Sequence, residues 1–349
     1  MRTLLCLLLA LIAASTHAAA AGPGGVWRGQ IGKLDAVACF DSDETGRYYY
    51  LRNGSLLNLA LQGDGYWHES ATGKARLTGR WQLQPPAGDR LTGQWSTADG
   101  KHPAPIQLKR IALQGAADGD PCENPAFTEA LRAATPLRPG KRFTQGDLSW
   151  REFSDKEGHV SGVLLEEPTP SPLGKALKAR LDENLDNLAS CRSSGSARGP
   201  DMWDYSVTEQ ITVVRPAWVV LSWSLDYFCG GAHPDGGSGG LTLERASGRE
   251  LKQAQWLKPP YDKGIEAGSP LVRKLLTRFG KLDADCREAL ATTSDWELWP
   301  SPTGVQARPM VYRAARGCEE VVTLPWAGAA PFLNEAGKRL MADMQAAKP

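Results

Sequence analysis

The sequence lacks the short motifs that identify most nucleotide-binding, redox and metal-dependent enzymes. It contains no Walker A sequence, no dinucleotide-binding glycine fingerprint and no C-x-x-C pair, so a nucleotide-binding fold, a zinc ribbon and a thioredoxin-like site all lack support. Histidine is also scarce, and His68, His102 and His159 are scattered along the chain. A metal site needs several ligands close together. We therefore expect neither a cofactor nor a bound metal.

An excess of charge of one sign is missing as well. Lys and Arg number 40 against 39 Asp and Glu, the net charge is +1, and no run of five like charges occurs. Proteins that bind nucleic acid or anionic membranes show a basic patch or stripe, so neither partner is expected. Three pairs of adjacent carboxylates do not suit a glycosidase, because neighbouring side chains diverge on a strand or a helix. These pairs are Glu166-Glu167, Asp182-Glu183 and Glu319-Glu320.

Long apolar runs are absent beyond the first residues. Arg2 is followed by an apolar stretch at 4–13 and small residues at 18–21, which is the pattern of a secretory signal peptide at 1–20. The stretch is shorter than the ~20 residues that span a bilayer, and Cys6 lies inside it and not after it. We expect neither a transmembrane segment nor a lipid anchor, and a mature protein that is periplasmic or secreted.

Export decides how the cysteines are interpreted. Six remain after removal of Cys6, and an even number in an oxidising compartment favours disulfides. Cys39 and Cys122 are the two in the N-terminal region, so we predict that they pair if the two regions fold separately. Pairing in order along the chain then predicts two more disulfides, although other pairings of these four cysteines stay open. The two predicted bonds are Cys191–Cys229 and Cys286–Cys318.

Residues 22–124 are predicted to form a β-rich domain. Short alternating runs are separated by glycine, and Asn53-Gly54 between two of them is a strong hairpin signal. The sequence LTGRW at 77–81 returns as LTGQW at 91–95. Strands at this spacing indicate an all-β meander that closes into a small barrel or a curved sheet. The Gly- and Asp-rich segment at 114–124 is the expected boundary.

The rest of the chain is predicted to be α+β. A linker with a short helix covers 125–141, and a domain with a mixed or antiparallel sheet and flanking helices covers 142–346. The clearest helix is 173–188, which has apolar residues at helical spacing. We also expect a connection at 135–140 and a loop at 193–200. The other expected strands are 147–154, 160–165, 205–214, a segment near Trp296 and 321–326, and the other expected helices are 270–279, 284–291 and 335–345.

The most informative stretch is 218–251. Residues 218–227 alternate in polarity as in a strand with one buried face, which should pair with the strand at 205–214. The sequence CGGAHPDGGSGG at 229–240 is so rich in glycine that we expect a loop. Ser238 lies in this segment without the strand–turn–helix context of a nucleophile elbow, so a Ser-His-Asp hydrolase is not expected.

Part of this stretch resembles a known family. An extracytoplasmic domain of unknown function carries a "Y-x-GGAH … TGK" signature, and it occurs in the lysozyme-sensing anti-sigma factor RsiV and in the peptidoglycan deacetylase PdaC. The resemblance covers about 142–345, and Cys229 and Trp326 depart from the pattern. The matching segments are Tyr227, Gly230-Gly231-Ala232-His233, Ser247-Gly248-Arg249, a first helix at 172–188 and closing segments at 314–317 and 320–326.

The resemblance implies recognition of an extracellular partner. Together with the missing catalytic motifs, it predicts a non-enzymatic envelope protein that binds a cell-wall-directed protein such as a lysozyme, or peptidoglycan. One alternative is an enzyme acting on cell-wall glycan or peptide with His233 and Asp226 at its centre, and another is a structural envelope protein without a small ligand. We expect the loop at 230–240 to contact the partner or to shape the surface that does. The candidate binding residues are Tyr227, Gly230, Gly231, His233, Asp235 and Trp256.

Overall fold

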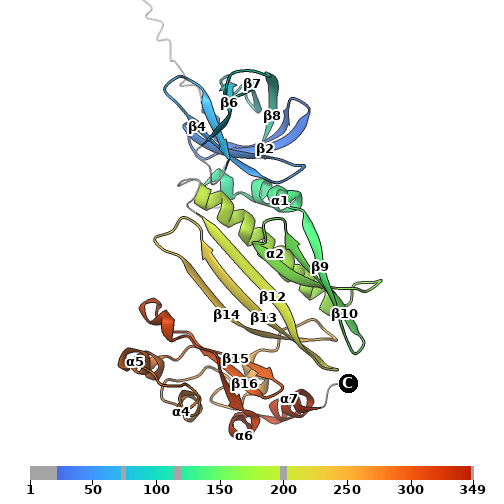
Figure 1. Cartoon of the computed structure of the whole chain (residues 1–349), viewed down its shortest axis with the longest axis vertical. Helices are drawn as coiled ribbons and strands as arrows, with labels where there is room; N and C mark the ends of the chain where they lie inside the picture. The colour runs from blue at the N-terminus through green and yellow to red at the C-terminus, as the bar shows by residue number, and fades with distance from the viewer. Residues whose placement is uncertain (1–21, 72–75, 114–118, 197–202, 347–349) are drawn as a thin grey trace, which may run out of the picture.

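The protein contains three β-sheets that follow one another along the chain. The computed structural model describes residues 22–71, 76–113, 119–196 and 203–346, so the predicted signal peptide lies outside the described residues. The sheets are a closed barrel, a six-stranded sheet and a three-stranded sheet. Figure 1 shows them arranged along the long axis, with the barrel at one end and the three-stranded sheet at the other. The architecture is mostly β with a few helices, which is consistent with the predicted α+β class.

The N-terminal sheet is a closed barrel, one of the two forms predicted from the sequence. Each strand pairs antiparallel with the next, and β1 pairs with both β2 and β8 to close the ring. The strands are β1 (Gly25–Ile31), β2 (Leu34–Phe40), β3 (Thr45–Tyr50), β4 (Leu56–Leu61), β5 (Trp67–Ala71), β6 (Leu77–Leu83), β7 (Arg90–Thr97) and β8 (Ala104–Ala112).

The local sequence signals explain how the barrel strands are connected. Gly54 has φ of +61° in the turn between β3 and β4, a conformation that glycine adopts without strain. The two repeats become the neighbouring strands β6 and β7, in which Trp81 lies opposite Trp95. Trp27, Trp67 and Trp81 are buried in the barrel core. Tryptophans in this region therefore serve packing.

A buried carboxylate lies inside the barrel. Glu69 accepts hydrogen bonds from the hydroxyl of Tyr48, from the hydroxyl of Thr78 at 2.7 Å and from the ring N–H of Trp95 at 2.7 Å. Burial and the charge of Glu69 raise the pKa of Tyr48, so this hydroxyl stays a donor. Because both carboxylate oxygens receive hydrogen bonds, the group is tolerated in the interior.

The second sheet has six strands in the order β14-β13-β12-β11-β10-β9. β11 and β12 are parallel, and the long helix α2 (Pro172–Ser196) connects them across one face of the sheet. Its apolar residues at the predicted helical spacing are buried against the strands; they are Leu173, Leu177, Leu181, Leu185 and Leu188. The strands are β9 (Leu137–Gln145), β10 (Leu148–Asp155), β11 (Val160–Leu165), β12 (Asp204–Val214), β13 (Trp218–Phe228) and β14 (Asp235–Glu244).

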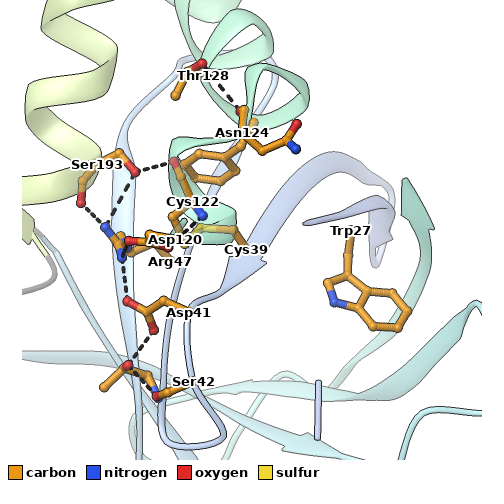
Figure 2. Close-up of a disulfide and its surroundings, with 12 residues drawn as sticks. Trp27, Cys39, Asp41, Ser42, Arg47, Asp120, Cys122, Asn124, Thr128 and Ser193 are labelled. Carbon is orange, nitrogen blue, oxygen red and sulfur yellow. Dashed lines mark hydrogen bonds and ion pairs between the residues drawn. A yellow bond between two sulfur atoms is a disulfide. The ribbon is translucent and has the colours of Figure 1, made fainter. Parts of the chain in front are cut away.

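A buried ion-pair cluster joins the barrel to this sheet. The side chain of Arg47 is 1% exposed and pairs with Asp41 and Asp120. It also donates to the backbone carbonyl of Ser193 in α2, whose hydroxyl donates to the carbonyl of Cys122 at 2.6 Å (Figure 2). Cys122 belongs to the short helix η2 (Pro121–Glu123), which precedes α1 (Pro125–Ala134). The guanidinium thus connects β3, η2 and α2.

The third sheet, in the order β15-β16-β17, packs with short helices at the C-terminal end. Its core includes Trp256, Trp299 and Trp326. The elements are α3 (Gln253–Trp256), α4 (Pro270–Leu276), α5 (Ala284–Thr292), β15 (Trp296–Ser301), β16 (Gly304–Pro309), η3 (Arg313–Cys318), β17 (Val322–Pro325), α6 (Trp326–Ala329), η4 (Ala330–Phe332) and α7 (Glu335–Gln345).

Three local predictions were wrong. The connection expected at 135–140 is mostly part of β9, because its backbone pairs with β10. Residues 193–196, expected in a loop, extend α2, whose last turns are held by the contact between Ser193 and Arg47. The strand β16 was not predicted, although it forms the centre of the third sheet. In each case the deciding contacts are made with another element of the structure.

The Gly-rich segment is the largest difference from the sequence prediction. Residues 235–240 are not a loop but the first half of β14, paired with β13. A Cβ at Gly240 would fall 2.2 Å from the ring of Trp299, and one at Gly239 would fall 2.5 Å from the carboxylate of Glu297. The missing side chains therefore let β15 approach the six-stranded sheet closely, which is a recognised use of glycine inside a strand.

All three predicted disulfides are present. Cys39 bonds to Cys122, and the two bonds predicted from chain order are Cys191–Cys229 and Cys286–Cys318. Three disulfides are typical of an extracytoplasmic protein. Among the described residues, no helix combines the length and the apolar character needed to cross a membrane.

Candidate functional site

An open cleft of about 660 Å³ lies between the six-stranded sheet and the C-terminal part of the chain. We call it the sheet cleft. One wall comes from the ends of β12 and β13 and the start of β14, and the other from β16, η3 and the residue that follows η3. Tyr227 and Phe228 contribute aromatic rings to the lining. Its charged residues are Asp204, Asp226, Asp235, Arg308, Arg316 and Glu319.

Strand pairing explains the position of the two acidic groups on the sheet wall. Asp226 lies opposite Ser206 on β12, and Asp204 is two residues from Ser206 on the same strand. Residues two apart point to the same face, so Asp204 and Asp226 are diagonal neighbours, with Cβ atoms about 7–8 Å apart or slightly less. On the other side, Asp226 lies opposite Gly236, which has no side chain. The sheet is therefore recessed beside Asp226.

Arg308 forms the buried side of the cleft. Its side chain is 4% exposed, and its Nη2 donates to Oε2 of Glu297 at 3.0 Å. Its Nη1 lies 3.7 Å from Oε2 of Glu319, and the guanidinium lies 5.2 Å from the ring centroid of Trp223. Burial raises the pKa of Glu297, and the neighbouring Arg308 charge opposes this shift. Arg308 is thus surrounded by partners from within the protein.

Arg316 connects η3 to the start of β14. Its Nη1 donates to Oδ1 of Asp235, and the backbone N–H of Gly236 donates to the same oxygen at 2.6 Å. The hydrogen bond from Arg316 lowers the pKa of Asp235, so this carboxylate stays ionised at neutral pH. The pair holds the η3 wall of the cleft against the sheet.

The charges around the cleft do not cancel. Four carboxylates and two guanidinium groups line it, and each guanidinium already has a carboxylate partner. Asp204 and Asp226 are exposed and take part in no ion pair among the described residues. The cleft therefore presents negative charge on the face of the sheet that carries Asp204 and Asp226.

The predicted site residues fall into three groups. Tyr227, Asp235 and Asp226 line the sheet cleft. Gly230, Gly231 and His233 lie in the turn between β13 and β14 and are not among the lining residues; Gly230 has φ of +80°, and His233 is exposed. Trp256 was expected as an aromatic anchor near the loop, but it is 1% exposed in the C-terminal core and cannot present its ring to a partner.

Sequence analysis missed the other wall of the cleft. Arg308 lies on the unpredicted strand β16 and carries no local signal. Arg316 falls within the segment 314–317, which was compared with a family signature, but no role was predicted for this residue. Glu319 was considered only as a member of an adjacent carboxylate pair, although its side chain is 8% exposed and lies 3.7 Å from Nη1 of Arg308.

The lining offers little for catalysis. It contains no histidine, cysteine or lysine among the described residues. Ser238 has the spacing of a nucleophile elbow, with Gly236 before it and Gly240 after it, but it lies inside β14 and not at a strand–turn–helix junction. Asp235 cannot serve as a general acid at neutral pH, because its pKa is lowered. Carboxylates, hydroxyls and an exposed phenol suit binding.

Two other clusters contain groups that could hold a metal ion, and both contain arginine. One joins Asp41, Asp120 and the disulfide-bonded Cys122 around Arg47 (Figure 2). In the other, Nη2 of Arg192 lies 3.1 Å from Nδ1 of His159 and within 3.6 and 3.7 Å of the carboxylates of Asp155 and Glu157; these three residues form the second candidate set. The guanidinium group supplies the positive charge in both places.

No protein-family model matches the chain, and no curated protein matches it. Among solved structures, the chain is similar to a DUF3298 family protein from Pseudomonas aeruginosa PAO1, with a TM-score of 0.37, 16% identity, and coverage of 58% of this chain and 95% of that chain. It is also similar to a member of the same family from Bacteroides fragilis NCTC 9343, with a TM-score of 0.37, 10% identity, and coverage of 61% and 98%.

The ion pair between Asp235 and Arg316 predicts a pH-dependent contribution to stability. Because the folded-state pKa of Asp235 is lowered, the pair stabilises the fold above the unfolded-state pKa of about 3.9 and loses this effect as pH falls through the folded-state value. Asp235→Asn should therefore lower the melting temperature at pH 7 and match the wild type in strong acid. A difference in melting temperature between Asp235→Asn and the wild type that persists unchanged down to about pH 2 would contradict this prediction.

Proposed function

We propose that the protein is a non-enzymatic binding protein of the cell envelope, periplasmic or secreted, and that its sheet cleft binds a basic, cell-wall-directed protein of the lysozyme type. The observation that carries the proposal is the acidic pair, Asp204 and Asp226, which lines the cleft and takes part in no ion pair among the described residues. Lysine and arginine side chains of a partner could pair with these carboxylates.

The resemblance to the domain of RsiV and PdaC supports this proposal. Tyr227 opens the matching signature, and Arg316 lies in one of the matching closing segments; both line the cleft. The other segments that carry the resemblance are not among the residues that line the cleft. In RsiV, the related domain belongs to a protein that senses lysozyme.

The charge of the cleft separates the proposed partner from the alternatives. Peptidoglycan carries carboxylates on its stem peptides, which an acidic cleft would repel. An enzyme centred on His233 and Asp226 is less favoured, because Asp226 lines the cleft and His233 does not. A purely structural protein would not require two neighbouring exposed carboxylates that form no ion pair among the described residues.

The first test is titration calorimetry of the mature protein with a c-type lysozyme at low salt. The double variant Asp204→Asn/Asp226→Asn should weaken binding by about tenfold, or about 1.4 kcal/mol, because two charge contacts are lost. The matched control is Asp43→Asn, an exposed barrel residue outside the cleft. Binding should also weaken steeply as salt is added.

Acetylated lysozyme, in which the lysine charges are removed, should bind poorly to the wild type. Equal affinity for native and acetylated lysozyme would show that charge does not direct recognition. No binding of native lysozyme by the wild type would refute the proposed partner class.

A further inference from the structure

Large apolar side chains are exposed around η3, beside the sheet cleft. Tyr312 is 65% exposed, and Met310 and Val321 are each 36% exposed, whereas Tyr227 at 37% lies inside the cleft. Met310, which precedes η3, lies next to the cleft. Nη2 of Arg308, a lining residue, lies 2.9 Å from the sulfur of Met310. Exposed tyrosine and methionine gathered in one region are typical of a protein-binding surface.

A second hollow, of about 540 Å³, lies on the other side of η3. We call it the α5 hollow. Tyr312 lines it together with three carboxylates from the start of α5, and no lysine or arginine is among the described lining residues. The three acidic residues are Asp283, Asp285 and Glu288. The α5 hollow therefore presents negative charge, as the sheet cleft does.

η3 is the ridge between the two hollows and is fixed on both sides. Arg316 lines the sheet cleft and pairs with Asp235, while Gly317 and Cys318 line the α5 hollow. Cys318 is bonded to Cys286 of α5. Since an ion pair holds one side and a disulfide the other, the two hollows keep a constant spacing. A rigid surface loses little entropy when it binds a partner.

We propose that the sheet cleft and the α5 hollow form one binding surface, which a basic protein contacts with two cationic patches placed on either side of η3. Tyr312 is the aromatic anchor of the α5 half. The inference rests on the proposed function and extends it, because it requires a partner large enough to reach across the ridge. A single basic side chain or a short peptide would fill only one hollow.

Charge complementarity favours this occupant over a metal ion. The carboxylates of the α5 hollow do not form one of the described clusters whose ligand atoms lie close enough to share an ion. Asp283 is also engaged, because it accepts a hydrogen bond from the backbone N–H of Cys286 at 2.7 Å and caps α5. Asp285, Glu288 and Tyr312 are exposed and can be changed without loss of a cap.

The test measures binding of native c-type lysozyme to variants of each half. Tyr312→Ala and Asp285→Asn/Glu288→Gln should each weaken binding by at least fivefold, and Glu266→Gln, an exposed residue outside both hollows, should not. Melting temperatures should match the wild type, because the changed side chains are exposed. Combining Tyr312→Ala with Asp226→Asn should multiply the two losses, since distant sites act independently.

The outcomes separate this inference from the proposed function. If the wild type binds lysozyme and Asp226→Asn weakens binding while all α5 variants match the wild type, the sheet cleft is the whole site and the two-part surface is wrong. If the α5 variants weaken binding of a single-lysine peptide as much as that of lysozyme, the requirement for a large partner is wrong. If lysozyme does not bind the wild type, both proposals fail together.

Discussion

Replacing Gly240 with valine is expected to destabilise the protein by about 3 kcal/mol, at the upper end of the cost of overpacking a core. A Cβ at this position would lie 2.2 Å from two atoms of the Trp299 ring, far inside van der Waals contact. Trp299 is buried between the two sheets and cannot swing into solvent. The clash would push β15 away from β14 and open the base of the C-terminal core. Urea unfolding followed by tryptophan fluorescence measures the loss.

Gly231→Val is the matched control for this experiment. Gly231 lies in the same Gly-rich segment but is exposed, and a Cβ there would meet no atom within 4 Å. It should change stability by less than about 0.5 kcal/mol, as surface substitutions usually do. Equal effects of the two substitutions would mean that the glycines act through chain flexibility and not through the close approach of Trp299.

Arg47→Met is expected to cost about 3–5 kcal/mol, the usual range when one partner of a buried ion pair is removed. The guanidinium is 1% exposed, and its loss would leave Asp41 and Asp120 facing each other without a cation. It would also remove the hydrogen bond to the carbonyl of Ser193, which connects the barrel to α2. The expected result is a lower denaturant midpoint of unfolding, with the contact between the barrel and α2 lost at a lower denaturant concentration than in the wild type.

Hydrogen exchange at the end of α2 would report that loss directly, because local opening exposes the backbone amides. Arg52→Met serves as the control, since Arg52 is exposed in the turn after β3. Retention of wild-type stability by Arg47→Met would indicate that the disulfide between Cys39 and Cys122, together with the hydrogen bond from Ser193 to the carbonyl of Cys122, holds the junction. In that case, the ion pairs would contribute nothing measurable.

Much of the fold could be predicted because its signals are local. Asn53-Gly54 marks a hairpin, the apolar spacing from Leu173 to Leu188 marks α2, and the alternating residues of β13 mark a strand. Each signal depends on residues within one element, so it can be recognised without knowing what the element packs against. The disulfide pairs followed from export and chain order and needed no geometry.

The candidate site could be predicted only in part. Tyr227 and Asp235 were identified because they lie in a recognisable stretch, and both line the sheet cleft. Trp256 was misplaced, because its burial depends on the helices that close the C-terminal core. Arg308 was missed, since it comes from a strand whose sequence carries no motif. A cleft between separate elements has no continuous sequence signature.

The Gly-rich strand β14 shows the difference between what the sequence determined and what only the tertiary structure decided. The sequence by itself determined the even set of cysteines, the barrel strands and the position of β13, because these depend on composition and local periodicity. It also predicts an export signal at 1–20, which lies outside the described residues. Only the tertiary structure decided that Gly239 and Gly240 belong to a strand, because the reason for glycine is the distant side chains of Glu297 and Trp299. The same packing brings Arg316 to Asp235 and so forms the cleft.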